Sequence, residues 1–232
     1  NAIESRLKKA DMMKKEFSKN MEGLNDFISS AKGIEDLKKL SEQRDVKTYR
    51  KKESVYSEGG YPKGVYFVVK GKVKTYKTHE GGKEFITALY KEGDFFGYLP
   101  LLEEGQYRDS ATVLEDSEVC MIPKEDFFSL IYKNSEVSRK FIKMMSDNLQ
   151  EMEEQLIKLA YNSVRKRVAE ALVTLANRYK KDSEQKFSMN ISREDLANLA
   201  GTATETTIRT LSDFKDEGLV DVKGGTIALV NY

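Results

Sequence analysis

The stretch ISREDLANLAGTATETTIRTLSDF near the carboxyl end constrains the fold of this chain more than any other part of the sequence. Ser192 stands three residues before Asp195, and Thr202 stands three residues before Glu205. This spacing is typical of a capping box, in which a hydroxyl accepts a backbone N–H of the first helical turn and the acid reaches back. Two helix starts are therefore predicted ten residues apart, with Gly201 ending the first helix. Two short helices joined by so tight a turn form a helix-turn-helix.

The second of these helices has one apolar and one polar face. Its polar face carries Glu205, Arg209 and Ser212. A carboxylate can accept a hydrogen bond from cytosine N4, and an arginine can bind guanine O6 and N7 together. The alternative is an ordinary salt bridge between Glu205 and Arg209, one turn apart, but their place at the start of the second helix favours base reading. Five apolar residues are predicted to form the shared core of the two helices: Leu196, Leu199, Ile208, Leu211 and Phe214.

The tail from 219 to 230 reads as two short apolar strands around a glycine turn, which predicts a hairpin. A hairpin after a helix-turn-helix makes the unit a winged helix. Arg193 and Lys223 are candidate phosphate contacts, with solvated surface charge as the alternative for each. Ser192 and Thr204, at the two helix starts, complete the DNA-contact candidates. Some winged helices bind only other proteins. This unit is barely basic, so its charge does not exclude that alternative.

The middle of the chain, from Val46 to about Pro123, changes to a hydrophobic period of two. Short apolar runs alternate there with glycine turns, which predicts a closed sandwich or barrel of antiparallel strands. Helical periodicity precedes this region and returns after it. The expected organisation is a helical leader at 1–45, an effector domain at 46–132, a long helix at 133–160 and a DNA-binding domain at 161–232.

The long helix carries an apolar seam in which steps of three and four residues alternate. We expect a parallel homodimer along this seam, because acidic residues flank it and leave one apolar stripe for a partner. The alternative is a helix that lies on its own domain. The predicted interface consists of Ile142, Met145, Leu149, Met152, Leu156 and Leu159.

Composition excludes several classes of function. The chain has 39 Lys and Arg against 38 Asp and Glu, and a net charge of +1 is too small to attract it to nucleic acid, so any DNA binding must depend on a local pattern. Cys120 is the only cysteine and cannot hold an iron–sulfur cluster or a structural zinc ion. His79, the only histidine, falls in a predicted hairpin tip, where a haem ligand is not expected. We expect no metal and no other cofactor.

The sequence also lacks the signals of an enzyme or a membrane protein. It contains no Ser-His-Asp set, no glycine-rich phosphate loop and too few histidines for a cupin-type metal site. Its apolar runs fall well short of the ~18 residues of a membrane span, and it shows no signal peptide. We expect a cytoplasmic protein that is not an enzyme and has no membrane partner.

The motifs VYFVVKGKVKTY…GDFFGYLPLLEEGQ and SREDLANLAG…TETTIRTL resemble the Crp/Fnr family, that of the cyclic-AMP receptor protein and the fumarate and nitrate reduction regulator. The resemblance implies an α+β fold, with N-terminal helices, an antiparallel β-roll like that of cyclic-nucleotide-binding proteins, a dimerisation helix and a winged helix-turn-helix. It implies a homodimer on double-stranded DNA at a near-palindromic operator, with RNA polymerase as a candidate partner. Glu205 and Arg209 match family base-reading positions, and Thr204 replaces a second family arginine.

The effector pocket that the resemblance implies departs from its nucleotide-binding pattern. A Phe-Gly-Glu stretch becomes Phe96-Gly97-Tyr98, and the phosphate-binding arginine of an Arg-Ser-Ala stretch is replaced by Asp109, before Ser110. Arg108 reaches the pocket only if the loop shifts by one residue, because neighbours on a strand face opposite ways. A Thr-Ser pair near the adenine becomes Met152-Glu153. Cyclic AMP is therefore not expected as the effector, and Tyr98, Tyr107 and Met152 are candidates for lining another apolar pocket or for the core.

Two alternative functions remain open from the sequence. One is a ligand-binding regulatory module that acts through a protein partner. The other is a regulator that responds to cyclic AMP through a rearranged pocket. The lysine-rich start IESRLKKADMMKKEF weakly resembles the terminal helix and linker of receiver domains, so an upstream signalling domain is a further hypothesis.

Overall fold

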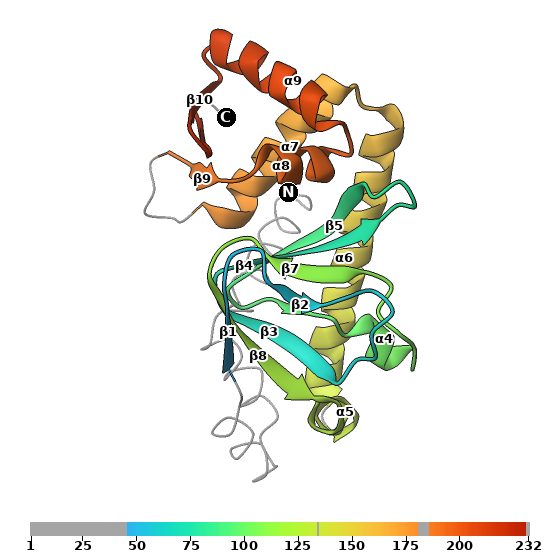
Figure 1. The fold of residues 1–232 in the computed structure, drawn as a ribbon. Coiled ribbons are helices and arrows are strands. Elements are labelled where there is room, and N and C mark those ends of the chain that lie inside the picture. Colours follow the sequence, from blue (N-terminus) through green and yellow to red (C-terminus); the bar gives the residue numbers. More distant parts are fainter. Residues whose placement is uncertain (1–45, 134, 181–185, 231–232) are drawn as a thin grey trace, which may run out of the picture.

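A computed structural model describes residues 46–133, 135–180 and 186–230 (Figure 1). The helical leader expected at 1–45 lies outside this part of the chain. Helices and antiparallel sheets are combined as the α+β expectation requires, in the order roll, long helix and C-terminal unit.

The roll consists of two four-stranded antiparallel sheets, with strand orders β1-β8-β3-β6 and β2-β7-β4-β5. Apolar runs bounded by glycine turns form most of these strands, as predicted. The lone histidine lies in the turn between β4 and β5, where the Nδ1 of His79 accepts a hydrogen bond from the backbone N–H of Gly81. The elements of the roll are β1 (Val46–Tyr49), β2 (Ser54–Tyr56), β3 (Gly64–Lys70), β4 (Lys72–Thr78), β5 (Glu84–Lys91), β6 (Phe95–Phe96), α4 (Leu99–Leu102), β7 (Ser110–Val113) and β8 (Ser117–Pro123).

Strand β3 is apolar along almost its whole length because both of its faces are covered. Val65 and Phe67 point to one face and pack in a cluster with two helices that follow the roll. Tyr66 and Val68 point to the other face and pack inside the roll. Side chains alternate between the faces of a strand, so two separate cores produce a continuous apolar run.

Two helices leave the roll and cover one of its sheets. Helix α5 (Lys124–Lys133) is short, and α6 (Ser135–Tyr161) is long. Figure 1 shows α6 running beside the roll from α5 up to the C-terminal unit. Phe127 of α5 and Phe141 of α6 are buried against the sheet and contact each other edge to face. Among the described helices, none has both the length and the apolar character required to cross a bilayer.

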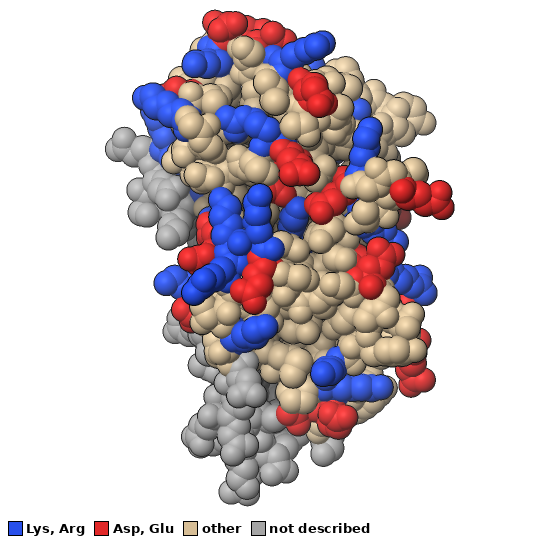
Figure 2. All heavy atoms as spheres, viewed as in Figure 1, with Lys and Arg blue, Asp and Glu red and all other residues tan. Residues whose placement is uncertain are grey.

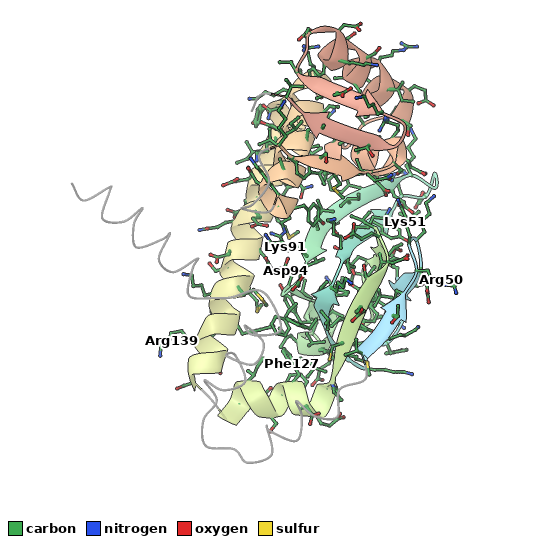
Figure 3. All side chains as sticks on the ribbon, turned by 90° about the vertical axis from the view of Figure 1, so that its left-hand side faces the viewer. Arg50, Lys51, Lys91, Asp94, Phe127 and Arg139 are labelled. Carbon is green, nitrogen blue, oxygen red and sulfur yellow. The ribbon has the colours of Figure 1, made fainter. Side chains whose placement is uncertain are left out.

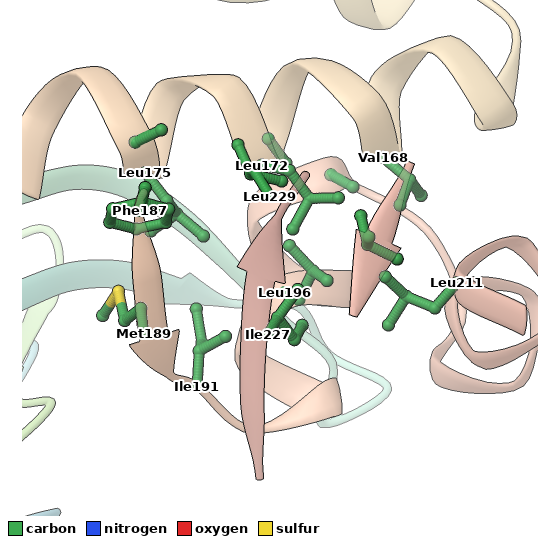
Figure 4. Close-up of a cluster of buried hydrophobic side chains, with 14 of the residues drawn as sticks. Val168, Leu172, Leu175, Phe187, Met189, Ile191, Leu196, Leu211, Ile227 and Leu229 are labelled. Carbon is green, nitrogen blue, oxygen red and sulfur yellow. The ribbon is translucent and has the colours of Figure 1, made fainter. Parts of the chain in front are cut away.

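The C-terminal unit is a winged helix. Helix α7 covers a three-stranded sheet of order β10-β11-β9, and its apolar side chains interlock with those of the strands (Figure 4). The predicted hairpin is present as β10 and β11, while the third strand, β9, was not predicted. The elements are α7 (Val164–Tyr179), β9 (Ser188–Asn190), α8 (Arg193–Ala200), α9 (Thr204–Asp216), β10 (Val220–Lys223) and β11 (Thr226–Leu229).

The roll and the winged helix share one apolar cluster. Ile86 and Leu89 of β5 and Leu114 after β7 belong to the same buried cluster as the core of the C-terminal unit. Asp94 lies at the end of the roll beside α7 (Figure 3), and its Oδ2 accepts a hydrogen bond from Nη2 of Arg178 at 3.0 Å. The two units are therefore packed together rather than joined by the chain alone.

Candidate nucleic-acid interface and effector pocket

The first helix of the helix-turn-helix starts where the sequence predicts. Ser192 is the N-cap of α8, and its Oγ accepts the backbone N–H of Asp195 at 2.9 Å. The Asp195 carboxylate does not reach back to the backbone as expected, because its Oδ2 instead accepts the Ser192 hydroxyl at 2.6 Å. Gly201 ends the helix in the left-handed conformation, with φ +62° and ψ +45°.

The predicted cap of the second helix is wrong. Ala203, not Thr202, is the N-cap of α9, and no side chain caps this end. The helix starts at Thr204, one residue later than the spacing suggested, so the two helix starts are eleven residues apart. The backbone N–H of Thr202 is already bonded to Ala197 O at the end of α8, which places Thr202 in the C-terminal turn of the first helix.

The inward face of α9 agrees only in part with the predicted core. Leu196, Leu211 and Phe214 are buried as predicted, and Leu199 is partly buried. Ile208 is not in the core, because 49% of it is exposed. The inward positions belong instead to two threonines, Thr207 and Thr210, whose hydroxyls donate to Ala203 O and Thr206 O.

The candidate base-reading residues lie on the exposed side of α9. Glu205, Arg209 and Ser212 are all exposed. Within the part of the chain that the structure describes, no ion pair joins Glu205 to Arg209, so the salt bridge weighed as their alternative role does not form. Both charged side chains remain available to a ligand. Thr204 is half-buried at the first position of the helix.

The candidate phosphate contacts cluster around the wing. Arg193 Nη2 donates to Gly224 O at 3.2 Å, so this arginine holds the wing turn against α8. Lys223 is exposed and lies 3.3 Å from the Asp221 carboxylate. Figure 2 shows lysines and arginines gathered along the boundary of roll and winged helix. At this boundary Lys51 Nζ donates to Asn190 Oδ1.

The interior of the roll is filled by aromatic rings. Tyr56 and Tyr107 stack face to face, with ring centroids 3.8 Å apart and an angle of 11° between the planes. Tyr66 and Phe96 extend this stack. Gly97 adopts φ +72°, and a Cβ there would lie only 3.0 Å from the Tyr66 ring and 3.2 Å from the Tyr56 ring. The rings therefore close over the glycine that the sequence placed in the effector pocket.

Two neighbouring residues of the pocket loop face opposite ways. Asp109 lies toward the interior, and its Oδ1 accepts the Tyr56 hydroxyl at 3.2 Å. Burial raises the pKa of the Asp109 carboxyl above its ordinary value, and the hydrogen bond from Tyr56 only partly opposes this rise. Arg108 faces outward, with 76% of its side chain exposed and Nη2 at 2.9 Å from Glu103. Ser110 Oγ accepts the backbone N–H of Glu58.

The two remaining pocket candidates are Tyr98, which packs against α6, and Met152, which is part of α6. Tyr98 turns away from the roll interior, packs edge to face on Phe141, and accepts a hydrogen bond from Asn148 Nδ2 at 2.6 Å. Met152 is exposed on α6. The structure thus brings Gly97 and Asp109 together with the tyrosine stack, and does not place Met152 among them.

The apolar seam of α6 separates into two groups. Met145 packs on the cluster beneath the roll, and Leu159 is half-buried against Gly201, where a Cβ would lie 2.6 Å from Leu159 Cδ2. The other four seam residues remain exposed, and Ile157 and Tyr161 add to the apolar surface. The exposed seam residues are Ile142, Leu149, Met152 and Leu156.

Comparison with known proteins agrees with this arrangement. Residues 46–134 match the cyclic nucleotide-binding domain, and residues 166–232 match the Crp-like helix-turn-helix domain. The chain is 33% identical over 179 residues to the cyclic AMP receptor protein of Thermus thermophilus, a match that covers 77% of this chain and 81% of that protein. The chain belongs to the Crp/Fnr family of transcription regulators. The family resemblance is confirmed, and so are the α+β fold, the β-roll and the C-terminal helix-turn-helix that it implied.

Other Crp/Fnr proteins are similar over much of their length. The fumarate and nitrate reduction regulatory protein of Vibrio cholerae is 27% identical over 208 residues, which is 89% of this chain and 82% of that protein. The structure of FixK2 from Bradyrhizobium japonicum superposes with a TM-score of 0.72 at 28% identity, over 81% of this chain and 93% of that one. As a Crp/Fnr regulator, the protein binds DNA through its helix-turn-helix.

Proposed function

We propose that this protein is a homodimeric, sequence-specific transcription regulator that reads bases with α9 and does not use cyclic AMP as its effector. The observation that carries the DNA-reading part is the exposure of Glu205 and Arg209 on one face of the second helix of the helix-turn-helix. A helix in this position enters the major groove and reads bases with side chains near its N-terminus.

The chemistry of the two side chains assigns them different bases. Arg209 has a planar guanidinium that can donate two parallel hydrogen bonds to guanine O6 and N7. Glu205, one turn earlier, can accept from cytosine N4. Thr204 is short, uncharged and half-buried, so we expect fewer base contacts per half-site than a second arginine at this position would give.

The exposed seam of α6 supports a dimer. Ile142, Leu149, Met152 and Leu156 follow one stripe of the helix and are exposed in the single chain. Burial of apolar surface against a second α6 is favourable by about 25 cal/mol per Å². A twofold dimer would present two α9 helices to half-sites one turn of DNA apart, roughly 34 Å.

The geometry of the roll interior supports an effector other than cyclic AMP. Asp109 places a carboxylate where a cyclic phosphate would need a cation, and Arg108 points to solvent toward Glu103. The stacked rings of Tyr56 and Tyr107 occupy space inside the roll. These residues do not fit a cyclic nucleotide. Isothermal titration calorimetry of the purified protein with cyclic AMP is expected to show no binding, and micromolar binding would contradict the proposal.

DNA reading is tested by selecting bound sites from random duplex DNA and measuring affinity by fluorescence anisotropy across a salt series. Wild-type affinity is expected to fall steeply with salt, because phosphate contacts release counterions. Arg209→Ala is expected to lose about 1–3 kcal/mol at the selected site and to relax the preference for guanine. Lys215→Ala removes the same charge near the other end of α9 and serves as the control, with the preference kept.

Two outcomes would contradict the proposed function. Equal affinity of the wild-type protein for selected and scrambled sites would remove sequence-specific reading. An absence of salt-dependent DNA binding would favour a ligand-binding module that acts through a protein partner.

A further inference from the structure

Helix α9 exposes one large apolar side chain between its two candidate base-reading charges. Ile208 lies three residues after Glu205 and directly before Arg209, and 49% of it is exposed. A single exposed isoleucine is ordinary on a protein surface. Its position is informative, because Glu205, Ile208, Arg209 and Ser212 follow the i, i+3, i+4, i+7 spacing of one helix face.

We propose that Ile208 determines specificity by contacting the C5-methyl group of a thymine in each half-site. This inference rests on the proposed function, since it requires α9 to lie in the major groove. It adds an apolar readout to the two hydrogen-bonding readouts of Glu205 and Arg209.

The chemistry of the major groove selects this ligand. Among the groups that base pairs present there, the thymine methyl is the apolar one. The Ile208 side chain has no polar atom, so it neither donates to a phosphate nor forms a hydrogen bond with a base edge. The face that it shares with Arg209 places it against the floor of the groove whenever Arg209 reaches guanine.

The stiffness of isoleucine favours a defined contact. A β-branched side chain in a helix has one strongly preferred χ1 rotamer, so the position of its methyl groups is set by the helix. Thr207 and Thr210 are buried on the opposite face of α9, and their hydroxyls donate to Ala203 O and Thr206 O within the same helix, so this face packs on the core without an unsatisfied hydroxyl. Ile208 is thus presented on a fixed surface.

The magnitude follows from the burial of one methyl group. Removal of the thymine methyl is expected to weaken binding about fourfold per half-site. In a twofold site with both half-sites changed, the two losses multiply to roughly fifteenfold.

The experiment uses the full chain and the operator obtained by selection. Each thymine of a half-site, with its symmetry mate, is replaced by deoxyuridine, which lacks only the C5-methyl group. The affinity is measured at fixed salt. With wild-type protein, one position is expected to show the loss given above. With Ile208→Ala that position should become insensitive to the methyl group, and Ile208→Val should retain part of the effect.

Two controls separate this contact from a general loss of binding. Val173→Ala shortens an exposed apolar side chain on α7 and should leave the uridine effect unchanged. Melting temperatures of the variants establish that they are folded. The inference is overturned if no uridine position weakens wild-type binding, or if the effect persists undiminished in Ile208→Ala. If selection returns no preferred site, the proposed function itself fails, which is a distinct outcome.

Discussion

Lys74 Nζ lies 2.7 Å from Asp195 Oδ1, and this contact joins the β-roll directly to the first turn of α8. The same ammonium lies 2.8 Å from Glu84 Oε2 on β5. Asp195 in turn accepts the hydroxyl of Ser192, the cap of the helix. Burial works against the charged form of Lys74, but the two carboxylates outweigh it and raise its pKa above the ordinary value. Lys74 therefore stays charged and ties the β-roll to the DNA-binding unit.

Loss of this ammonium is expected to weaken the junction of roll and winged helix. Lys74→Met keeps most of the side-chain volume and leaves Asp195 and Glu84 without a cation. Removing one partner of a buried ion pair costs about 3–5 kcal/mol, and the partial exposure of Glu84 puts the expected loss at the low end. Chemical denaturation measures it. Lys223→Met, at an exposed site on the wing, is the control and should change stability little.

The packing around Gly201 predicts that Gly201→Ala will lower the stability of the protein by more than backbone strain alone would. Its φ of +62° is unfavourable for alanine, and a Cβ would lie 2.6 Å from Leu159 Cδ2 and 3.3 Å from Phe85. Gly218 has a similar φ of +74° with no atom within 4 Å of the added Cβ. Gly218→Ala is expected to cost about 1–2 kcal/mol in stability from backbone strain alone. Gly201→Ala is expected to cost more, because the Leu159 side chain must also shift. Thermal unfolding measures both losses of stability. Equal losses for the two variants would show that the contact of Gly201 with Leu159 of α6 adds nothing to the cost.

The half-buried carboxyl of Asp109 predicts that its replacement by an amide will stabilise the protein. Its pKa in the folded protein is raised above 3.8, so folding favours the protonated carboxyl. The stability that this provides is fully present below pH 3.8 and is lost as the pH rises through the folded pKa. Asp109→Asn keeps an acceptor for the Tyr56 hydroxyl and removes the half-buried charge. The variant should melt higher than wild type at pH 7, with the difference shrinking toward pH 4. A difference independent of pH would contradict the assignment, and exposed Asp216→Asn should show none.

The exposed seam of α6 predicts that charge will separate the dimer. Leu149→Glu with Leu156→Glu places two carboxylates on each helix at the proposed interface. Light scattering should then report a mass of one chain in place of two. Val173→Glu, on α7, adds the same charge to another exposed apolar position and should leave the mass unchanged. A wild-type protein with the mass of one chain would remove the dimer from the proposal.

The sequence was sufficient for features encoded by local pattern and insufficient for those set by contacts between distant segments. The cap at Ser192 and the glycine at 201 were predicted because each is decided within one helical turn. The cap at Thr202 was not predicted correctly, because its backbone N–H is bonded to the end of α8. Ile208 was misplaced because Thr207 and Thr210 occupy the inward positions, and apolar character alone did not indicate that two threonines would be buried there. The ion pair of Lys74 with Asp195 could not be predicted, because the two residues are distant in sequence. A lysine in a strand is expected to face solvent.

Helix α6 touches three parts of the molecule along one stripe, through Asn148 to Tyr98, Gln155 to the Ile86 carbonyl, and Leu159 to Gly201. The three residues sit on one rigid rod that rises about 1.5 Å per residue. An axial slip by one residue would therefore displace all three contacts together. Because a single helix carries them, a movement of α6 at one end would be felt both in the β-roll and at the turn of the helix-turn-helix.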